Sequence, residues 1–248
     1  MIFISYGAIK SASSFAFLLA NDVAIQSEPR KEIEDLLPPK LQSIFIQEIS
    51  DCIDELVETV PQDKMYVVKT HQHLDKKLYT HLRMGTVMAS ISYRDPYDIL
   101  VSLLDAGKRE RTIEDISKRR EVFASVFTLD DALAKIPWIL SSNRSWLDLV
   151  GILPRLIATP FEMLRNQPRS VVAGYARMMD VEVDASRIVN KFLENRELIT
   201  EYNRGEPGRG HKEIQIPVDH PYRKAMDQFV NQYLNQDFMD QKNENPAH

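Results

Sequence analysis

The chain has 248 residues, of which 44% are hydrophobic and 27% are charged, and its formal net charge at pH 7 is −5. This composition is that of a globular protein, and the acidic balance argues against nucleic acid as a partner, because phosphate neutralisation needs an excess of Lys and Arg. The single cysteine, Cys52, excludes an intramolecular disulfide and a zinc site built from several cysteines. We expect one domain over residues 1–240 and a polar tail over residues 241–248.

The most apolar stretch near the start, ASSFAFLLA at residues 12–20, is too short to span a membrane, which takes about 18–20 apolar residues. It is also a poor signal peptide, because only Lys10 precedes it and no clean small-residue cleavage pattern follows. We therefore expect no membrane span and a cytoplasmic protein.

Hydrophobic spacing predicts strands and helices that alternate along the chain. In chain order, we predict a strand at 2–6, a helix at 13–25, a long amphipathic helix at 40–59, a strand at 65–69, a helix at 75–83, a strand at 87–93 and a helix at 96–105. The charged residues 106–120 are expected to form a loop or a solvated helix. Further on, we predict helices at 121–136, 144–150, 168–179, 184–195 and 219–235, a strand at 154–158 and a loop at 203–212.

Strands that alternate with helices indicate an α/β domain with a mostly parallel sheet. In such sheets, ligands bind at the carboxyl ends of the strands, where the strand-to-helix loops meet. The residues at these ends are therefore the candidates for a functional site.

The loop after the first strand, GAIKSASSF at residues 7–15, places one lysine among small hydroxyl residues. A loop that enters a helix points N–H groups at a ligand, and the helix N-terminus favours an anion. Lys10 adds a full charge, and Ser11, Ser13 and Ser14 add hydroxyl donors. The spacing does not match G-x-x-x-x-G-K-[ST]. An anion site and a serine-capped helix are both compatible with this stretch.

Cationic residues also end the next two predicted strands. Lys69 and His71 end the second strand in the stretch VVKTH, and Arg94 ends the third in RDPYDILVS, whose last residue is Ser102. The stretch NRGEPG at 203–208 is a further cationic loop.

Taken together and in this order, these stretches resemble the PAPS-dependent sulfotransferases, where PAPS is 3′-phosphoadenosine-5′-phosphosulfate. Residues 10–15 resemble the family's 5′-phosphosulfate loop P-K-S-G-T-T-W, with Ile9, Ala12 and Phe15 in place of its proline, glycine and tryptophan. Residues 69–71 match the family's K-T-H.

The resemblance continues in three later stretches. Residues 94–102 match the 3′-phosphate motif R-[ND]-P-x-D-x-x-x-S, and TPFEML at 159–164 resembles [RY]-Y-E-D-L. NRGEPG at 203–208 is similar to the closing R-K-G-x-x-G loop, with Asn203 in place of its first cation.

This resemblance implies a P-loop-like three-layer α/β/α fold, with a central mostly parallel sheet and many surrounding helices. It also implies transfer of a sulfuryl group from PAPS to a hydroxyl or amine of a small-molecule or glycan-like acceptor, without a metal. The product of the donor is 3′,5′-adenosine bisphosphate, PAP.

The resemblance assigns roles to individual residues. His71 would be the general base, Lys10 would stabilise the leaving 5′-phosphate and Lys69 would steady the sulfuryl oxygens. Arg94, Ser102 and Arg204 would hold the 3′-phosphate, with Phe15 and Phe161 on either side of the adenine. The full cofactor-binding set is Lys10, Ser11, Ala12, Ser13, Ser14, Phe15, Arg94, Ser102, Phe161, Asn203, Arg204 and Gly205.

Two other functions stay open at this point: a non-catalytic nucleotide-binding member of the same fold, and an ATP-dependent small-molecule kinase. The acceptor and the oligomeric state are not indicated. Large apolar residues outside the motifs, Trp138 and Trp146 among them, fit either an acceptor pocket or the core.

Overall fold

A computed structural model of the chain describes residues 1–27, 30–195 and 206–234. These residues divide into two compact units. Residues 1–93 and 142–195 belong to the first unit, and residues 94–141 and 206–234 belong to the second.

The first unit is built on a four-stranded sheet of parallel strands in the order β2-β1-β3-β4. The strands are β1 (Ile2–Gly7), β2 (Tyr66–Thr70), β3 (Val87–Tyr93) and β4 (Leu156–Pro160). Every residue of β1 and β3 is buried. These strands have continuous apolar or small sequences because helices cover both faces of a parallel sheet.

Helices pack on this sheet through the side chains that alternate along its strands. The helices that lie wholly in the first unit are α1 (Ser13–Ser27), α2 (Arg30–Glu34), α3 (Ile53–Thr59), α4 (Lys76–Met84), α9 (Phe161–Asn166), α10 (Pro168–Met179) and α11 (Ala185–Glu194). Phe3, Val67 and Met88 lie in one row across the sheet and pack in a core with α1, α10 and α11.

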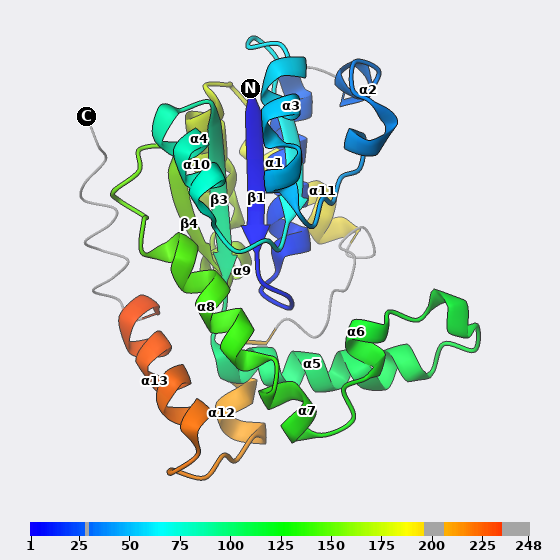
Figure 1. Ribbon diagram of the computed structural model, residues 1–248, viewed down its shortest axis with the longest axis vertical. Helices are drawn as coiled ribbons and strands as arrows, with labels where there is room; N and C mark the ends of the chain where they lie inside the picture. The colour runs from blue at the N-terminus through cyan, green and yellow to red at the C-terminus, as the bar shows by residue number, and fades with distance from the viewer. Residues whose placement is uncertain (28–29, 196–205, 235–248) are drawn as a thin grey trace. The chain divides into compact units, whose positions relative to one another are not determined.

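The second unit begins at Arg94, directly after β3 (Figure 1). Its helices are α5 (Pro96–Arg111), α6 (Glu121–Ala124), α7 (Leu129–Leu133), α12 (Arg209–Glu213) and α13 (Pro221–Tyr233). Asp95 caps α5, its side chain accepting the Tyr97 N–H at 2.8 Å, and Pro96 occupies the first helical position. The chain returns to the first unit within α8 (Ile136–Leu147).

Four parallel strands with helices on the sheet confirm the predicted α/β fold class. The four predicted strands are present, each within two residues of its expected bounds.

The predicted long helix over residues 40–59 is wrong. Short 3-10 turns lie at Pro39–Leu41 and Ile49–Asp51, and only α3 is an α-helix. Between them, the Ile46 N–H donates to the Lys69 carbonyl at 3.0 Å, and the Lys69 N–H donates to the Ile44 carbonyl at 2.8 Å. The segment is extended because it satisfies the exposed backbone groups of the edge strand β2.

Other boundaries also differ from the predictions. The helix α5 continues to Arg111, six residues beyond its predicted end. Residues 121–136 hold the two short helices α6 and α7 rather than one long helix. The helix predicted at 144–150 is instead α8, which begins at Ile136 and ends at Leu147. The helix α12 begins inside the predicted loop over 203–212. Among the described residues, no helix has the length and apolar character needed to cross a membrane.

Candidate functional site

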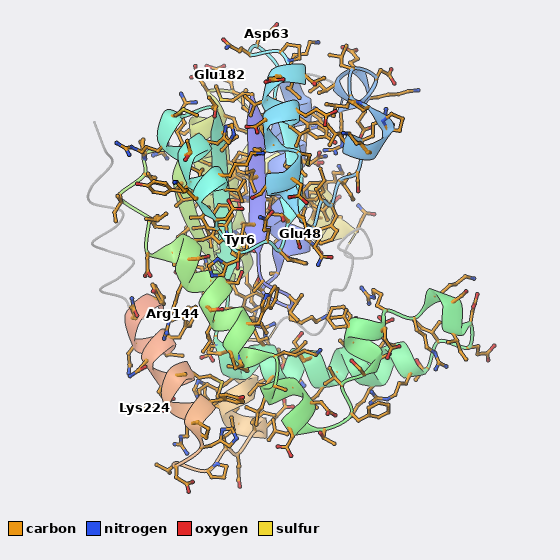
Figure 2. The ribbon with its side chains drawn as sticks, viewed as in Figure 1. Tyr6, Glu48, Asp63, Arg144, Glu182 and Lys224 are labelled. Atoms are coloured by element: carbon orange, nitrogen blue, oxygen red, sulfur yellow. The ribbon has the colours of Figure 1, made fainter. Side chains whose placement is uncertain are left out.

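The carboxyl ends of the strands in the first unit gather the residues that the sequence singled out. In Figure 2, Tyr6 and Glu48 are labelled at this end of the sheet, while Asp63 and Glu182 lie at the opposite end. Lys10 follows β1, and Lys69 pairs with Ser5 across the sheet.

The loop after β1 has a backbone suited to an anion. Lys10 and Ala12 have positive φ angles of 63° and 67°. Alternation of left-handed and right-handed residues turns successive N–H groups toward one point, which makes an anion-binding nest. The Ser11 hydroxyl donates to the Ala8 carbonyl at 2.7 Å and so closes this turn. The first N–H groups of α1, which follow at Ser13, have no partner within the helix.

A glycine is needed where this loop leaves the strand. A Cβ added to Gly7 would lie 2.0 Å from the Ser92 Oγ and 2.8 Å from the Ser11 Oγ. Any larger residue would displace the loop from the end of β3.

Lys69 brings a second cation to the loop. Its Nζ donates to the Ser14 Oγ at 2.9 Å and lies 5.9 Å from the centre of the Phe45 ring. Lys10 lies three residues before the N-terminal turn of α1 in the chain, and Lys69 reaches the same turn from the neighbouring strand β2. Two cations, a nest and a helix N-terminus form a donor set that fits a phosphate or a phosphosulfate.

His71 lies at the end of β2, with its Nδ1 hydrogen-bonded to the Gly7 carbonyl. A carbonyl oxygen only accepts, so Nδ1 carries the proton and the lone pair of the neutral ring is at Nε2. Burial, followed by the charge of Lys69, lowers the pKa of His71 to about 4. The ring is therefore neutral at pH 7 and able to accept a proton at Nε2.

Arg94 and Ser102 belong to the second unit; Arg94 directly precedes the Asp95 cap of α5, and Ser102 lies about two turns into that helix. Arg94 is 9% exposed, and its Nη2 donates to the Glu206 carbonyl at 3.1 Å and lies 3.4 Å from the Asp98 Oδ2. Asp98 is buried and accepts the N–H groups of Gly208 at 2.9 Å and Gly210 at 2.8 Å. These bonds tie residues 206–210 to the first turn of α5.

The remaining predicted residues lie in different places. Phe15 is partly buried, with its ring centre 6.0 Å from that of Phe192, and Phe161 is 8% exposed at the first position of α9. Ser102 is 5% exposed. Asn203, Arg204 and Gly205 lie outside the described residues.

Solved structures resemble this chain along most of its length. Retinol dehydratase in a complex with retinol and PAP matches over 95% of this chain and 81% of its own, at 13% identity and a TM-score of 0.57. Mouse sulfotransferase SULT7A1 complexed with PAP matches over 98% of this chain and 88% of its own, at 14% identity and a TM-score of 0.57. The chain has the sulfotransferase fold.

A bacterial example of the sulfotransferase fold also matches. The sulfotransferase domain of the Synechococcus PCC 7002 olefin synthase aligns with 95% of this chain and 94% of its own, at 13% identity and a TM-score of 0.53. Compared by sequence, the chain matches no family model and no curated protein.

Two residues with structural roles in this fold, Asp98 and Trp146, are not assigned a role by the sequence motifs. Asp98 lies in the RDPYDILVS stretch without an assigned role, and its spacing four residues after Arg94 is the signal that the two side chains approach each other. The sequence allows Trp146 to lie in either a pocket or the core; its side chain is fully buried and belongs to the core, whereas Trp138 is 45% exposed. No local signal identifies the contacts of Trp146.

Proposed function

We propose that this protein is a PAPS-dependent sulfotransferase that acts on a hydroxyl or amine of a small-molecule or glycan-like acceptor. The observation that carries the proposal is that Lys69 and a neutral His71 both bond to residues 7–14, the loop that contains Lys10, at Ser14 and Gly7 respectively. PAPS, when bound, would supply the sulfuryl group that is transferred.

The chemistry of the transfer explains the residue types. An acceptor loses a proton as its bond to sulfur forms, and the Nε2 of His71 would take that proton. Negative charge grows on the 5′-phosphate as it leaves, and Lys10 with the N–H groups of its loop would stabilise it. Lys69 would hold the sulfuryl oxygens. No metal is needed for these steps.

The proposal assigns the rest of the nucleotide to the other residues that the sequence motifs single out. Arg94, Ser102 and Arg204 would bind the 3′-phosphate, since a guanidinium can grip it with two hydrogen bonds. Asn203 and Gly205 would complete this contact. Phe15 and Phe161 would contact the adenine.

An apolar alcohol is the acceptor class that the surroundings of His71 support. Phe45 is 37% exposed with its ring centre 5.1 Å from that of His71, and the neighbouring Ile44 is 51% exposed. Retinol dehydratase has been crystallised with retinol and with androsterone, which are both apolar.

The single cysteine is consistent with a cytoplasmic site of action.

A second candidate function, nucleotide binding without transfer, is favoured by one observation. Ala12 adopts φ 67°, a left-handed conformation that costs a non-glycine residue about 1–2 kcal/mol. The family's glycine avoids this cost, whereas the loop of this chain carries it. A loop that departs from the family pattern at this residue would keep the nucleotide site but not the geometry that transfer requires.

The test is a thermal-shift comparison of PAP, PAPS, ATP and AMP, because a ligand that binds only the folded state raises the melting temperature. We expect PAP and PAPS to raise it well above the effect of ATP or AMP. A gain with ATP alone would indicate the kinase, and no gain with PAP would overturn the proposal. PAP binding without transfer of labelled sulfate to any alcohol or amine in a broad panel would indicate the non-catalytic function.

A further inference from the structure

The C-terminal half of α8 contacts the strand that leads into the proposed phosphosulfate loop. Trp146 and Tyr6 are both fully buried, and their rings stack at 4.8 Å with an interplanar angle of 17°. The Tyr6 hydroxyl donates to the Ser142 Oγ at 2.8 Å. Burial raises the pKa of Tyr6, so this hydroxyl stays protonated and remains a donor.

The same part of α8 also holds the segment that follows His71. The Trp146 Nε1–H donates to the Gln72 carbonyl at 3.0 Å. The Ser145 Oγ accepts the Leu74 N–H at 3.1 Å and donates to the Ser142 carbonyl at 2.7 Å. Two hydrogen bonds therefore connect α8 to residues 72–74.

These contacts hold the residues on either side of one hydrogen bond, the bond between His71 and Gly7. The Nδ1 of His71 donates to the Gly7 carbonyl. Gly7 follows Tyr6, which stacks on Trp146, and Gln72 follows His71 and accepts the Trp146 indole N–H. The buried Trp146 side chain thus contacts Gln72, the residue after the donor His71, and Tyr6, the residue before the acceptor Gly7. All of these residues belong to the first unit.

We infer that Trp146 is a positioning residue, which keeps the His71 ring against the Gly7 carbonyl and thereby fixes the imidazole tautomer with its lone pair at Nε2. The inference rests on the proposed function for its consequence, since a general base must present that lone pair to the acceptor. Free histidine in water prefers the other tautomer, with the proton on Nε2. The fold must therefore supply the preference, and an acceptor fixed at Nδ1 supplies it.

The charged and aromatic groups around His71 do not select a tautomer. Lys69 is the charged group that acts on the ring, and it disfavours protonation at either nitrogen. The Phe45 ring is tilted by 57° from the imidazole and offers no hydrogen-bond acceptor in its side chain. The backbone carbonyls of Gly7 and Thr70 both act on the ring as hydrogen-bond acceptors, and the Gly7 carbonyl is the one bonded to Nδ1. Trp146 contacts the residues next to both partners of that Nδ1 bond.

The test replaces the indole donor while keeping an aromatic ring. In Trp146→Phe the stack on Tyr6 is retained and the bond to the Gln72 carbonyl is lost. Ring nitrogens are read by two-bond ¹H–¹⁵N correlation spectra at pH 7, with the His71 signals assigned by their loss in His71→Gln. We expect the unchanged protein to show a protonated Nδ1 and an unprotonated Nε2, and Trp146→Phe to show both nitrogens shifted toward intermediate values.

Two further variants make the result decisive. Ser145→Ala removes the bond to the Leu74 N–H with a small change in packing, and we expect a smaller shift in the same direction; it carries the test if Trp146→Phe does not fold. Tyr175→Phe is the matched control, because Tyr175 is a fully buried aromatic in the core of the same unit and its hydroxyl contacts Thr159 instead. It should leave the His71 signals unchanged.

The same variants give a kinetic readout in the transfer reaction. Trp146→Phe should lower kcat by roughly 10- to 100-fold, since a misplaced catalytic group costs about that much, and leave the Kd of PAP unchanged. A folded Trp146→Phe with the His71 ring signals of the unchanged protein would overturn the inference. The spectra need neither PAPS nor an acceptor, so this outcome is independent of the nucleotide test of the proposed function.

Discussion

His71 is a histidine whose surroundings oppose its protonation. Its pKa in the folded protein is about 4, well below the ordinary value of about 6.5, chiefly because the ring is buried. Between these two values, the unfolded chain binds a proton that the folded protein does not. The contribution of His71 to the free energy of unfolding is therefore complete above pH 6.5 and is lost as the pH falls toward 4.

This difference predicts a pH dependence of stability that disappears with the side chain. Between pH 7 and pH 4.5, the unchanged protein should lose up to about 2 kcal/mol more unfolding free energy than His71→Gln, with solvent access to the ring reducing that figure. Urea unfolding of both proteins at the two pH values measures it. Other titrating groups are common to both, so parallel losses would show that His71 is not buried in its neutral form.

At the scale of elements, α12 and the start of α5 meet at a point where only glycine fits. A Cβ added to Gly210 would lie 2.1 Å from the Tyr97 carbonyl carbon and 2.5 Å from the Asp98 N. The same approach lets the Gly210 N–H reach the Asp98 carboxylate. The backbone of α5 leaves no room for a side chain at this position.

Alanine substitutions at Gly210 and Gly208 measure two different costs, steric crowding at Gly210 and backbone strain at Gly208. Gly210→Ala should destabilise the protein by about 3 kcal/mol, because it overpacks the contact and breaks a hydrogen bond to a buried carboxylate. Gly208 has φ 75° and open space around an added Cβ, so Gly208→Ala should cost only about 1 kcal/mol of strain.

Urea unfolding gives both values, and hydrogen exchange at the amides of α12 shows whether that helix has detached. Equal losses in the two alanine variants would mean that the contact between Gly210 and Tyr97 is not tight in solution.

The elements that the sequence predicts well are those with local causes. The buried parallel strands have continuous apolar sequences, and α5 has its Asp95 cap and Pro96 start. The segment 42–48 has apolar residues at helical spacing, yet its conformation is set by pairing with Lys69, which local periodicity does not report. Tertiary pairing outweighed the helical pattern there.

The same distinction holds for the site. Lys10, Lys69 and His71 could be grouped from the sequence because parallel strands end at one edge of a sheet. The bond from Trp146 to Gln72 joins residues 74 positions apart, and the bond from Gly210 to Asp98 joins residues 112 positions apart. Such contacts depend on how helices pack, and no motif predicted them.

At the scale of the whole molecule, the net charge of −5 gives an anionic nucleotide no general attraction. Affinity must then come from a few local cations. The proposed function divides these cations between the two ends of the nucleotide: Lys10 and Lys69 would bind the 5′ end, and Arg94 would bind the 3′-phosphate.

This division predicts which variant affects which nucleotide, measured by titration calorimetry with PAP and AMP. Arg94→Gln should weaken PAP binding by roughly 10- to 100-fold, the loss expected for a hydrogen bond to a charged group, and leave AMP binding unchanged. Lys10→Ala should weaken both by a similar factor, because both nucleotides carry the 5′-phosphate. If Arg94→Gln weakened AMP binding as much as PAP binding, Arg94 would affect affinity by stabilising the folded structure rather than by contacting the 3′-phosphate. The 3′-phosphate would then need other partners in the chain.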